Sequence, residues 1–389
     1  MVTHKNFSQL TLLDSRKSQS ALEYMMTYGW AILIIVIVAV ILYSMGIFNP
    51  ASSISSTITG FSATPVSNAI CTANGVLRIA VGDTVGHRIL IKNISATSNG
   101  KTEVFTPTST VDPNPIITSG NTYIFSIPNV CPAAGTRFSA NVNINYTEPT
   151  TSFSTSQYTS TGTVTGTVSS TNLPAYVAYF NGAGANFHAY TSQITSKITF
   201  SFWGDFPAQP ASPSLLFLNF TNSGGWGGPD TLYSYLWGPV GGQPAVNLVL
   251  FATNSTGGVI ANGGGNTQVD GRWHFVSFEA TDSWVALFVD GSMIYNDSTS
   301  SSVNVGPVSL QLGENQWAKC YMYNLQIYDS ILPASQISAL YTSGFGSVFT
   351  NSGTVSEWLL NGTSKDYSGN NNNGIINSEV EFTSNYPAS

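Results

Sequence analysis

Two stretches in the C-terminal half of the chain decide its fold: Asp270–Phe278, with the sequence DGRWHFVSF, and Trp284–Gly291, with the sequence WVALFVDG. Both are short runs rich in aromatic and apolar residues, and the second ends in an Asp-Gly pair, which is a good β-hairpin turn. We therefore expect two strands here, the second leading into a hairpin. Since Asp-Gly is common in hairpins, the second stretch alone does not identify a family.

Further strand-like runs surround these two stretches. Ile198–Trp203 precedes them, and Val308–Gly313 and Tyr321–Tyr328 follow. The segment Tyr176–His188 opens the block, and Leu332–Tyr341 has the pattern of a short capped helix near its end. The block is therefore expected to be mainly β.

The order of these segments resembles the laminin-G-like, concanavalin A-like jelly roll. The matching features are an F-x-G opening, an ITFSFW strand, a DGRWHFV strand, an LFVDG hairpin and an IYDSILPASQI closing turn. Their combination is more specific than any one piece. The resemblance implies a jelly-roll domain over residues 173–389.

The C-terminal tail bears on the topology of this domain. Trp358–Gly362 and Lys365–Gly374 look like the segment that usually opens such a domain, yet here they come last. We infer a circular permutation, in which the tail (residues 355–382) supplies the strand missing before Tyr176. The alternative is the truncated start of a second copy, but the 15 residues after Gly374 are too few to complete one.

Residues 50–172 are expected to form a separate β-sandwich. Period-two alternation, with Gly, Asn and Pro between the runs, is the signature of strands, and repeated strands imply a sandwich. The runs are Val76–Val81, Arg88–Lys92, Thr122–Ile127 and Phe138–Tyr146.

Two of the three cysteines, Cys71 and Cys131, lie in this sandwich block close to expected strands, whereas Cys320 lies in the jelly roll. In an oxidising exterior, a bridge closing a loop of this size stabilises a fold by about 4 kcal/mol. We expect a Cys71–Cys131 disulfide and a free Cys320. The alternative for the first two is a pair of buried free thiols.

An uncharged apolar run, Gly29–Phe48, lies near the N-terminus. At ~1.5 Å per residue it covers the ~30 Å hydrocarbon layer of a bilayer, which predicts a transmembrane helix. Lys5, Arg16 and Lys17 precede it and the next basic residue is Arg78, so the N-terminus is expected in the cytoplasm and the remainder outside the cell. A cleaved secretory signal is the alternative, but its apolar core is usually shorter.

The residues before this run resemble the class III signal peptides of archaeal type IV pilins. In that family a basic residue precedes the cut, a Gln becomes the new N-terminus and a Glu lies at the fifth mature position. Lys17, Gln19 and Glu23 match these places. Ser18 departs from the commoner glycine before the cut, and Ala21 stands where the family has Ser.

The resemblance implies a leader over residues 1–18, cut between Ser18 and Gln19 by a prepilin peptidase, and a pilin-like helix over residues 19–49. In a filament such helices pack together as neighbouring subunits. Glu23 could then pair with the freed amine of Gln19 on a neighbour, which would offset the cost of a carboxylate in an apolar setting.

The composition agrees with an exported chain. Only 8% of residues are charged, against about 25% in ordinary soluble domains. A net charge of −7 with scattered Lys and Arg argues against a nucleic-acid partner, which needs a basic patch. Within the part expected outside the cell, sequons for N-glycosylation occur at Asn93, Asn145, Asn219, Asn254, Asn296 and Asn361, and they are compatible with that location.

Catalysis finds little support in the sequence. His87, His188 and His274 show no metal-ligand spacing, and His274 alternates with aromatic residues as a structural histidine would. Jelly-roll glycosidases need two carboxylates facing the scissile bond, but the glutamates here are isolated and form no E-x-D-x-E cluster. Cys320 has no local nucleophile motif. We expect a protein that is not an enzyme.

A binding surface is the better hypothesis. The Gly-rich loop around Trp226 and Asp230, followed by Tyr233, Tyr235 and Trp237, could present aromatic faces to sugar rings. The alternative is that these aromatic residues only fill the core or an edge.

Calcium is a further expectation, because domains of the resembled family often hold Ca²⁺ through loop carboxylates and carbonyls. Asp230 and Asp270 are the candidate ligands, although neither has a second acid at a recognisable spacing.

The leading functional hypothesis is a cell-surface, pilin-like subunit with an adhesive head that binds glycans or proteins. The first alternative is a monomeric binding protein that uses the helix only as a membrane tether. The second is a secreted carbohydrate-active hydrolase. The sequence does not identify the ligand.

Overall fold

The computed structural model describes most of the two predicted β-blocks. The described residues are 28–38, 40, 56–182, 184–194, 196–207, 218–221, 231–237, 247–253, 259–264, 271–298, 308–312, 319–347 and 353–387. The chain divides into two compact units, residues 1–55 and residues 56–389.

The N-terminal unit contains residues 28–38 and Val40 in helical conformation, with exposed side chains. The rest of the predicted membrane helix and the whole predicted leader, including Ser18, Gln19 and Glu23, lie outside the described residues. Within the described ranges, no helix is both long enough and apolar enough to cross a membrane.

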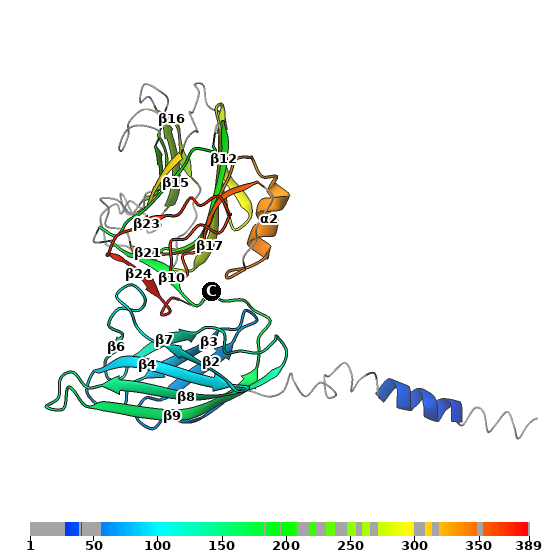
Figure 1. Ribbon diagram of the computed structural model, residues 1–389. Coiled ribbons are helices and arrows are strands. Elements are labelled where there is room, and N and C mark those ends of the chain that lie inside the picture. Colours follow the sequence, from blue (N-terminus) through cyan, green and yellow to red (C-terminus); the bar gives the residue numbers. More distant parts are fainter. Residues whose placement is uncertain are drawn as a thin grey trace, which may run out of the picture. The chain divides into compact units, whose positions relative to one another are not determined.

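The first β-block is a sandwich of two antiparallel sheets (Figure 1). The larger sheet has the order β1 (Thr57–Gly60), β9 (Gln157–Thr167), β8 (Arg137–Thr147), β4 (Ile89–Ser98), β5 (Lys101–Phe105), with β6 (Ile116–Ile117) also on β4. The smaller sheet has the order β2 (Val66–Cys71), β3 (Leu77–Gly82), β7 (Thr122–Ile127).

Alternation of side chains explains this sandwich. Along β8, Phe138, Ala140, Val142 and Ile144 are buried, and the residues between them face solvent or are half-buried. Because successive side chains of a strand point to opposite faces, this pattern buries one face of the large sheet against the small one. β7 has the predicted bounds, whereas β4 runs six residues beyond Lys92, to Ser98.

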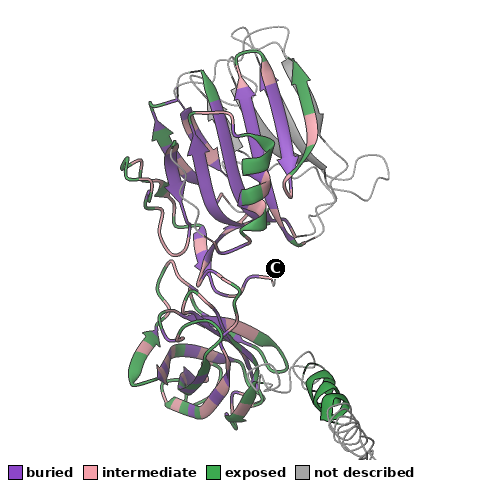
Figure 2. Ribbon diagram, turned by 90° about the vertical axis from the view of Figure 1, so that its right-hand side faces the viewer, coloured by how far each residue is buried: buried purple, intermediate pink, exposed green. Residues whose placement is uncertain are grey.

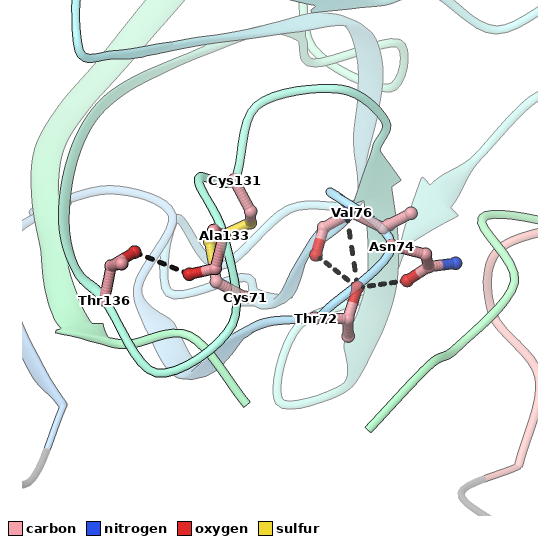
Figure 3. Close-up of a disulfide and its surroundings, with 7 residues drawn as sticks. All are labelled: Cys71, Thr72, Asn74, Val76, Cys131, Ala133 and Thr136. Atoms are coloured by element: carbon pink, nitrogen blue, oxygen red, sulfur yellow. Dashed lines mark hydrogen bonds between the residues drawn. A yellow bond between two sulfur atoms is a disulfide. The ribbon is translucent and has the colours of Figure 1, made fainter. Parts of the chain in front are cut away.

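A disulfide joins Cys71, at the end of β2, to Cys131, after β7, as expected, with their Cα atoms 5.6 Å apart (Figure 3). The adjoining turn is held by Thr72, whose Oγ1 lies 2.7 Å from Asn74 Oδ1 and 3.0 Å from Val76 O. Cys320 is free and buried, and burial raises the pKa of its thiol.

The second block is a larger sandwich. One sheet has the order β19 (Ser292–Ser298), β18 (Trp284–Val289), β17 (Trp273–Thr281), β12 (Lys197–Asp205), β21 (Lys319–Tyr328), β10 (Val177–Asn181), β24 (Val380–Thr383), with β22 (Thr354–Trp358) also on β21. The other has the order β16 (Val259–Gly264), β15 (Asn247–Thr253), β14 (Thr231–Trp237), β13 (Leu218–Thr221), β20 (Val308–Leu312), β11 (Phe187–Thr191), β23 (Ile375–Ile376).

Both faces of the eight-stranded sheet are covered. On the inner face, Phe200, Phe202 and Phe278 belong to the core between the two sheets. On the outer face lies the helix α2 (Ala334–Thr342), which buries Ile337 and Leu340. Figure 2 shows the exposed side of α2 in green against the buried strands of this sheet.

The tail completes both sheets of this sandwich. β22 pairs with β21, β23 pairs with β11, and β24 pairs with β10. The fully buried Trp358 of β22 packs edge-on against Phe187, and its Nε1 donates to Asn372 O at 2.8 Å. The tail therefore supplies strands to the domain before it, as expected from the sequence, whereas the circular permutation itself stays a prediction.

The end of the tail also contacts the first sandwich. Asp112 N donates to Phe382 O at 2.8 Å, and Phe382 N donates to Thr110 O at 2.7 Å. Arg78 is buried, with its Nη2 3.1 Å from Ser384 O and its guanidinium 3.9 Å from the centre of the Tyr386 ring. We call residues 380–387 the C-terminal strap, because they belong to the jelly roll and contact both sandwiches.

Candidate functional site

The surface predicted from the sequence is only partly described. Trp226, Asp230 and Asp270 lie outside the described residues. Tyr233, Tyr235 and Trp237 occupy alternate positions of β14, which is hydrogen-bonded between β13 and β15. Their side chains are not described, so their proposed contact with a ligand stays a prediction, as does Ca²⁺ binding at the two aspartates.

A different site stands out in the described part, on the outer face of the eight-stranded sheet. It is a cavity of about 550 Å³ between β12, β17, the end of α2 and the segment that leaves the first sandwich. Its lining residues are Ser170, Thr171, Asn172, Trp203, Trp273, Tyr341, Thr342, Ser343, Gly344, Phe345 and Ser347. We call it the aromatic pocket.

Four aromatic residues form the apolar wall of the pocket. Trp273 and Phe345 stack with ring centres 4.2 Å apart, and Trp203 stacks on Tyr341 at 6.0 Å. Trp203 and Trp273 are only 6% and 7% exposed, whereas Tyr341 is half-buried. Tyr341 is therefore the ring with the most surface available to a ligand.

Strand register explains why these rings meet. Trp203 of β12 pairs with Phe275 of β17, so these two side chains lie on the same face of the sheet. Trp273 is two residues before Phe275 on β17, so it lies on that outer face as well. Phe345, which lies in the loop after α2, packs edge-on against Trp203, with the two ring centres 5.8 Å apart.

The polar rim of the pocket is held by its own hydrogen bonds. Ser343 Oγ donates to Leu340 O at 2.6 Å and Thr342 Oγ1 lies 2.9 Å from Ser338 O, so these hydroxyls cap carbonyls at the end of α2. Ser347 Oγ donates to Ser343 O at 2.6 Å, which closes the loop. A rim with fixed side chains needs little ordering when a ligand binds.

Gly346 lets the loop approach the segment between the sandwiches. Its φ is +90°, and a Cβ there would lie 2.7 Å from Asn172 O. A larger residue would therefore be strained and would also push residue 172 away from the rim. The pocket depends on this close approach because Asn172 is one of its lining residues.

Glu279 fixes the other end of α2. Its Oε1 accepts a hydrogen bond from Leu332 N at 2.9 Å and lies 3.1 Å from Thr199 Oγ1. Burial raises the pKa of the Glu279 carboxyl to about 7, although both hydrogen bonds act in the opposite direction. The carboxyl thus ties the turn before α2 to the sheet that carries the pocket.

The lining residues define what the pocket can bind. They offer aromatic rings, hydroxyls, an amide and backbone groups, and none of them carries a charged side chain. Such a set can pack against the apolar face of a ligand while hydrogen-bonding its hydroxyls. It has no strong complement for a charged group, because no opposite charge lines it.

The predicted structural role of His274 agrees with its contacts. Its Nδ1 lies 2.8 Å from Asp290 Oδ2, and Asp290 Oδ1 accepts a hydrogen bond from Phe275 N at 3.0 Å. Asp290 has a φ of +50° and stands at the Asp-Gly hairpin turn. Among the described residues, no group of three or more His, Cys, Asp or Glu side chains is placed to hold a metal ion.

The sequence did not reveal the pocket because its residues come from distant segments. Ser170–Asn172 lie at the end of the predicted first sandwich, and Trp203 ends a predicted strand. Tyr341 ends the predicted helix, and residues 342–347 follow it. The only local signal was the small-residue, hydroxyl-rich run TSGFGS at 342–347, which resembles an ordinary helix end.

Comparison with known families supports the jelly-roll prediction. The profile of the concanavalin A-like lectin/glucanases superfamily matches residues 180–338, which include Trp203 and Trp273. These residues therefore form a laminin-G-like, concanavalin A-like jelly-roll domain, and that part of the prediction is confirmed. A search of curated proteins found no match to the chain.

Several solved structures are similar to the chain at low identity. The binding domain of Paraclostridial Mosquitocidal Protein 1 has 14% identity and a TM-score of 0.32, with 43% of each chain covered. A Bacteroides ovatus protein, named as a proposed carbohydrate-binding protein, has 10% identity and a TM-score of 0.41, covering 84% of this chain and 91% of that one. The SAP-like pentraxin of Limulus polyphemus has 13% identity and a TM-score of 0.33, covering 52% and 94%. The chain thus spans less than half of the mosquitocidal binding domain.

Proposed function

We propose that the chain is a cell-surface protein whose jelly roll binds an uncharged glycan in the aromatic pocket without hydrolysing it. The observation that carries this proposal is an uncharged cavity, lined by aromatic rings and hydroxyls, on a domain of a superfamily that includes lectins. Sugars present both apolar ring faces and hydroxyls, so they match the two kinds of lining group.

The same superfamily also includes glucanases, so hydrolysis has to be weighed. Glycoside hydrolysis canonically uses two carboxyl groups about 5–9.5 Å apart, on either side of the scissile bond. The residues that line the aromatic pocket include no Asp or Glu. Binding without hydrolysis is therefore the activity that this pocket supports.

The N-terminal segment gives the proposed location. Its basic leader, its long apolar run and the Lys17, Gln19 and Glu23 register favour a pilin-like helix, with the jelly roll outside the cell. A filament would display many copies of the pocket, and this multivalency would raise the overall avidity for a glycan. Avidity matters here because the pocket has one accessible ring and each single contact is weak. A monomeric, membrane-tethered binding protein would use the same pocket at lower avidity.

A binding experiment tests the pocket. Residues 56–389, which form one compact unit, are applied to an array of neutral and acidic glycans. Tyr341→Ala should weaken binding of a neutral glycan roughly fivefold or more, since an aromatic contact contributes about 1 kcal/mol. Tyr190→Ala is the matched control, because this tyrosine is 60% exposed on β11 of the other sheet.

Other results of this experiment would contradict the proposal. Loss of binding in Tyr190→Ala, with Tyr341→Ala unchanged, would place the ligand on the seven-stranded sheet. Loss in Trp226→Ala or Trp237→Ala alone would favour the surface predicted from the sequence. Release of reducing sugars from a bound glycan would instead support a hydrolase.

The proposed location has its own test. The N-terminus of the protein, purified from its native membrane, is identified by peptide mass spectrometry. We expect Gln19 as the first residue, because the register of Lys17 and Glu23 places the cut after Ser18. An intact Met1 would leave the tethered monomer as the better hypothesis.

A further inference from the structure

Six sequons lie in the part of the chain expected outside the cell, after residue 49. Side chains are described for the four acceptors Asn93, Asn145, Asn296 and Asn361. Transfer of a glycan needs an accessible amide nitrogen and an accessible hydroxyl two residues later. The four sites can therefore be compared by exposure and by existing hydrogen bonds.

Asn93 and Asn145 are poor acceptors because they bind each other. They face one another across β4 and β8, and Asn145 Nδ2 donates to Asn93 Oδ1 at 2.7 Å. Thr159 Oγ1 donates to Asn145 Oδ1 at 2.6 Å. Thr147, the hydroxyl residue of the second sequon, is buried. Modification at either site would have to break a paired, half-buried array.

Asn361 stands in a tight turn. It is half-exposed, and its neighbours Leu360 and Gly362 both have positive φ, at +52° and +110°. The segment therefore cannot be presented as an extended strand without refolding.

Asn296 has the opposite surroundings. It lies in β19, the terminal strand of the eight-stranded sheet in the described structure, and both Asn296 and Ser298 are exposed. The two residues are two positions apart in a strand, so they share one face. Asn296 Nδ2 lies 3.2 Å from Met293 Sδ, which is a weak acceptor.

The middle residue of this sequon does not obstruct its face. Asp297 occupies the alternate position, and its Oδ2 accepts a hydrogen bond from Tyr295 Oη at 3.2 Å. Because Tyr295 and Asp297 are also two positions apart, they belong to the other face of the strand. The carboxylate is thus held away from the acceptor amide and its hydroxyl.

We propose that Asn296 is an N-glycosylation site, and that it is the occupied one among these four sequons. In the transfer, Asn296 Nδ2 forms a bond to the anomeric carbon of a lipid-linked oligosaccharide. The bond from that carbon to the lipid phosphate breaks, the lipid phosphate leaves, and Nδ2 loses one proton to a base of the transferase. The proposal rests on the proposed external location of the jelly roll.

A glycan at this position would act on the sheet edge. A terminal strand presents backbone groups that can pair with another chain, and Met293 beside the sequon is 45% exposed. A bulky, hydrated group on β19 would block such pairing. The opposite terminal strand, β24, already contacts residues 110–112 through backbone hydrogen bonds.

The test is made on full-length protein from its native cells. Glycopeptide mass spectrometry should find a glycan on the peptide containing Asn296. Asn296→Gln and Ser298→Ala should each lower the intact mass by that glycan, whereas Ser298→Thr should retain it. Asn145→Gln and Asn93→Gln are matched controls that should leave the glycan mass unchanged.

An unmodified Asn296 would overturn the inference, as would a glycan on Asn93, Asn145 or Asn361 instead. Surface labelling of intact cells distinguishes this from failure of the proposed function. A chain that is labelled outside while Asn296 is bare refutes only the glycosylation site. A chain that is not labelled refutes the external location as well.

Discussion

At the scale of single residues, four buried or half-buried carboxyl groups each make folding more favourable at low pH than at neutral pH. Burial raises the pKa of Asp112, Glu279, Glu357 and Glu381, and that of Glu279 reaches about 7. A raised pKa in the folded state means that folding favours the protonated form. Such a group contributes its full stability below its unfolded pKa, and this contribution is lost as the pH rises through the folded value.

Glu279→Gln tests this at one position. In the wild type, the free energy of unfolding should fall between about pH 4.5 and 7, with at most about 3 kcal/mol from Glu279. The amide cannot ionise but can still accept from Leu332 N, so the variant should lose that part of the pH dependence. Thermal melts of both proteins from pH 4 to 8 measure the difference, and parallel curves would contradict the assignment.

Residues differ in how far the sequence could predict their role. The Cys71–Cys131 bridge and the structural role of His274 follow from nearby strand patterns. The sequence predicted Asp290 only as the first residue of the Asp-Gly hairpin turn, and it did not predict the contact between Asp290 and His274. Tyr341 and Asn172 were not predicted, because nothing in their local sequence shows that they line one cavity.

At the scale of elements, alternation predicts strands well and pairing poorly. Phe138–Tyr146 was predicted within one residue of the observed bounds of β8 at each end, since buried and exposed residues alternate clearly there. β23 has only two residues, too few for any alternation of polar and apolar residues. Its pairing with β11 therefore depends on where the rest of the tail places it. Long-range pairs of this kind are set by the whole core rather than by local sequence.

The tail strands lead to a prediction for truncation. Deleting everything after Gly353 removes β22, β23 and β24, and with them the fully buried Trp358 and one of the two partner strands of β10. The remaining protein should aggregate or melt at a much lower temperature, because a core side chain and an edge partner are lost together. Solubility and melting temperature measure this.

The matched control is a shorter truncation that removes only Ala388 and Ser389, which should behave like the full chain. If the long deletion were as stable and as monomeric as this control, the tail would not be an integral part of the jelly roll. The circular permutation would then lose its support.

At the scale of the whole molecule, the fold class was predictable and the site was not. Repeated strands imply sandwiches, and the order of the second block identifies its family resemblance. The aromatic pocket arises only when the segment from the first sandwich, two strands and a helix end come together. The assembly of the pocket from these distant segments depends on tertiary packing, which cannot be predicted from local sequence patterns.

The C-terminal strap gives a prediction for the connection between the two sandwiches. Asp112 is buried, and its carboxylate accepts hydrogen bonds from Tyr123 Oη at 2.7 Å, Thr383 Oγ1 at 2.8 Å and Ser384 N at 3.1 Å. Thr383 and Ser384 belong to the strap, whereas Asp112 and Tyr123 belong to the first sandwich. This one carboxylate therefore gathers donors from both sandwiches.

Asp112→Asn should separate the unfolding of the two sandwiches. Asn tolerates the φ of +42° at this position, so the backbone is not strained further, but an amide NH₂ would replace one acceptor oxygen among several donors. Each buried donor left without a partner costs roughly 1–3 kcal/mol. We expect one calorimetric transition in the wild type and two in the variant, the first at a lower temperature. An unchanged single transition in Asp112→Asn would show that the strap does not couple the sandwiches.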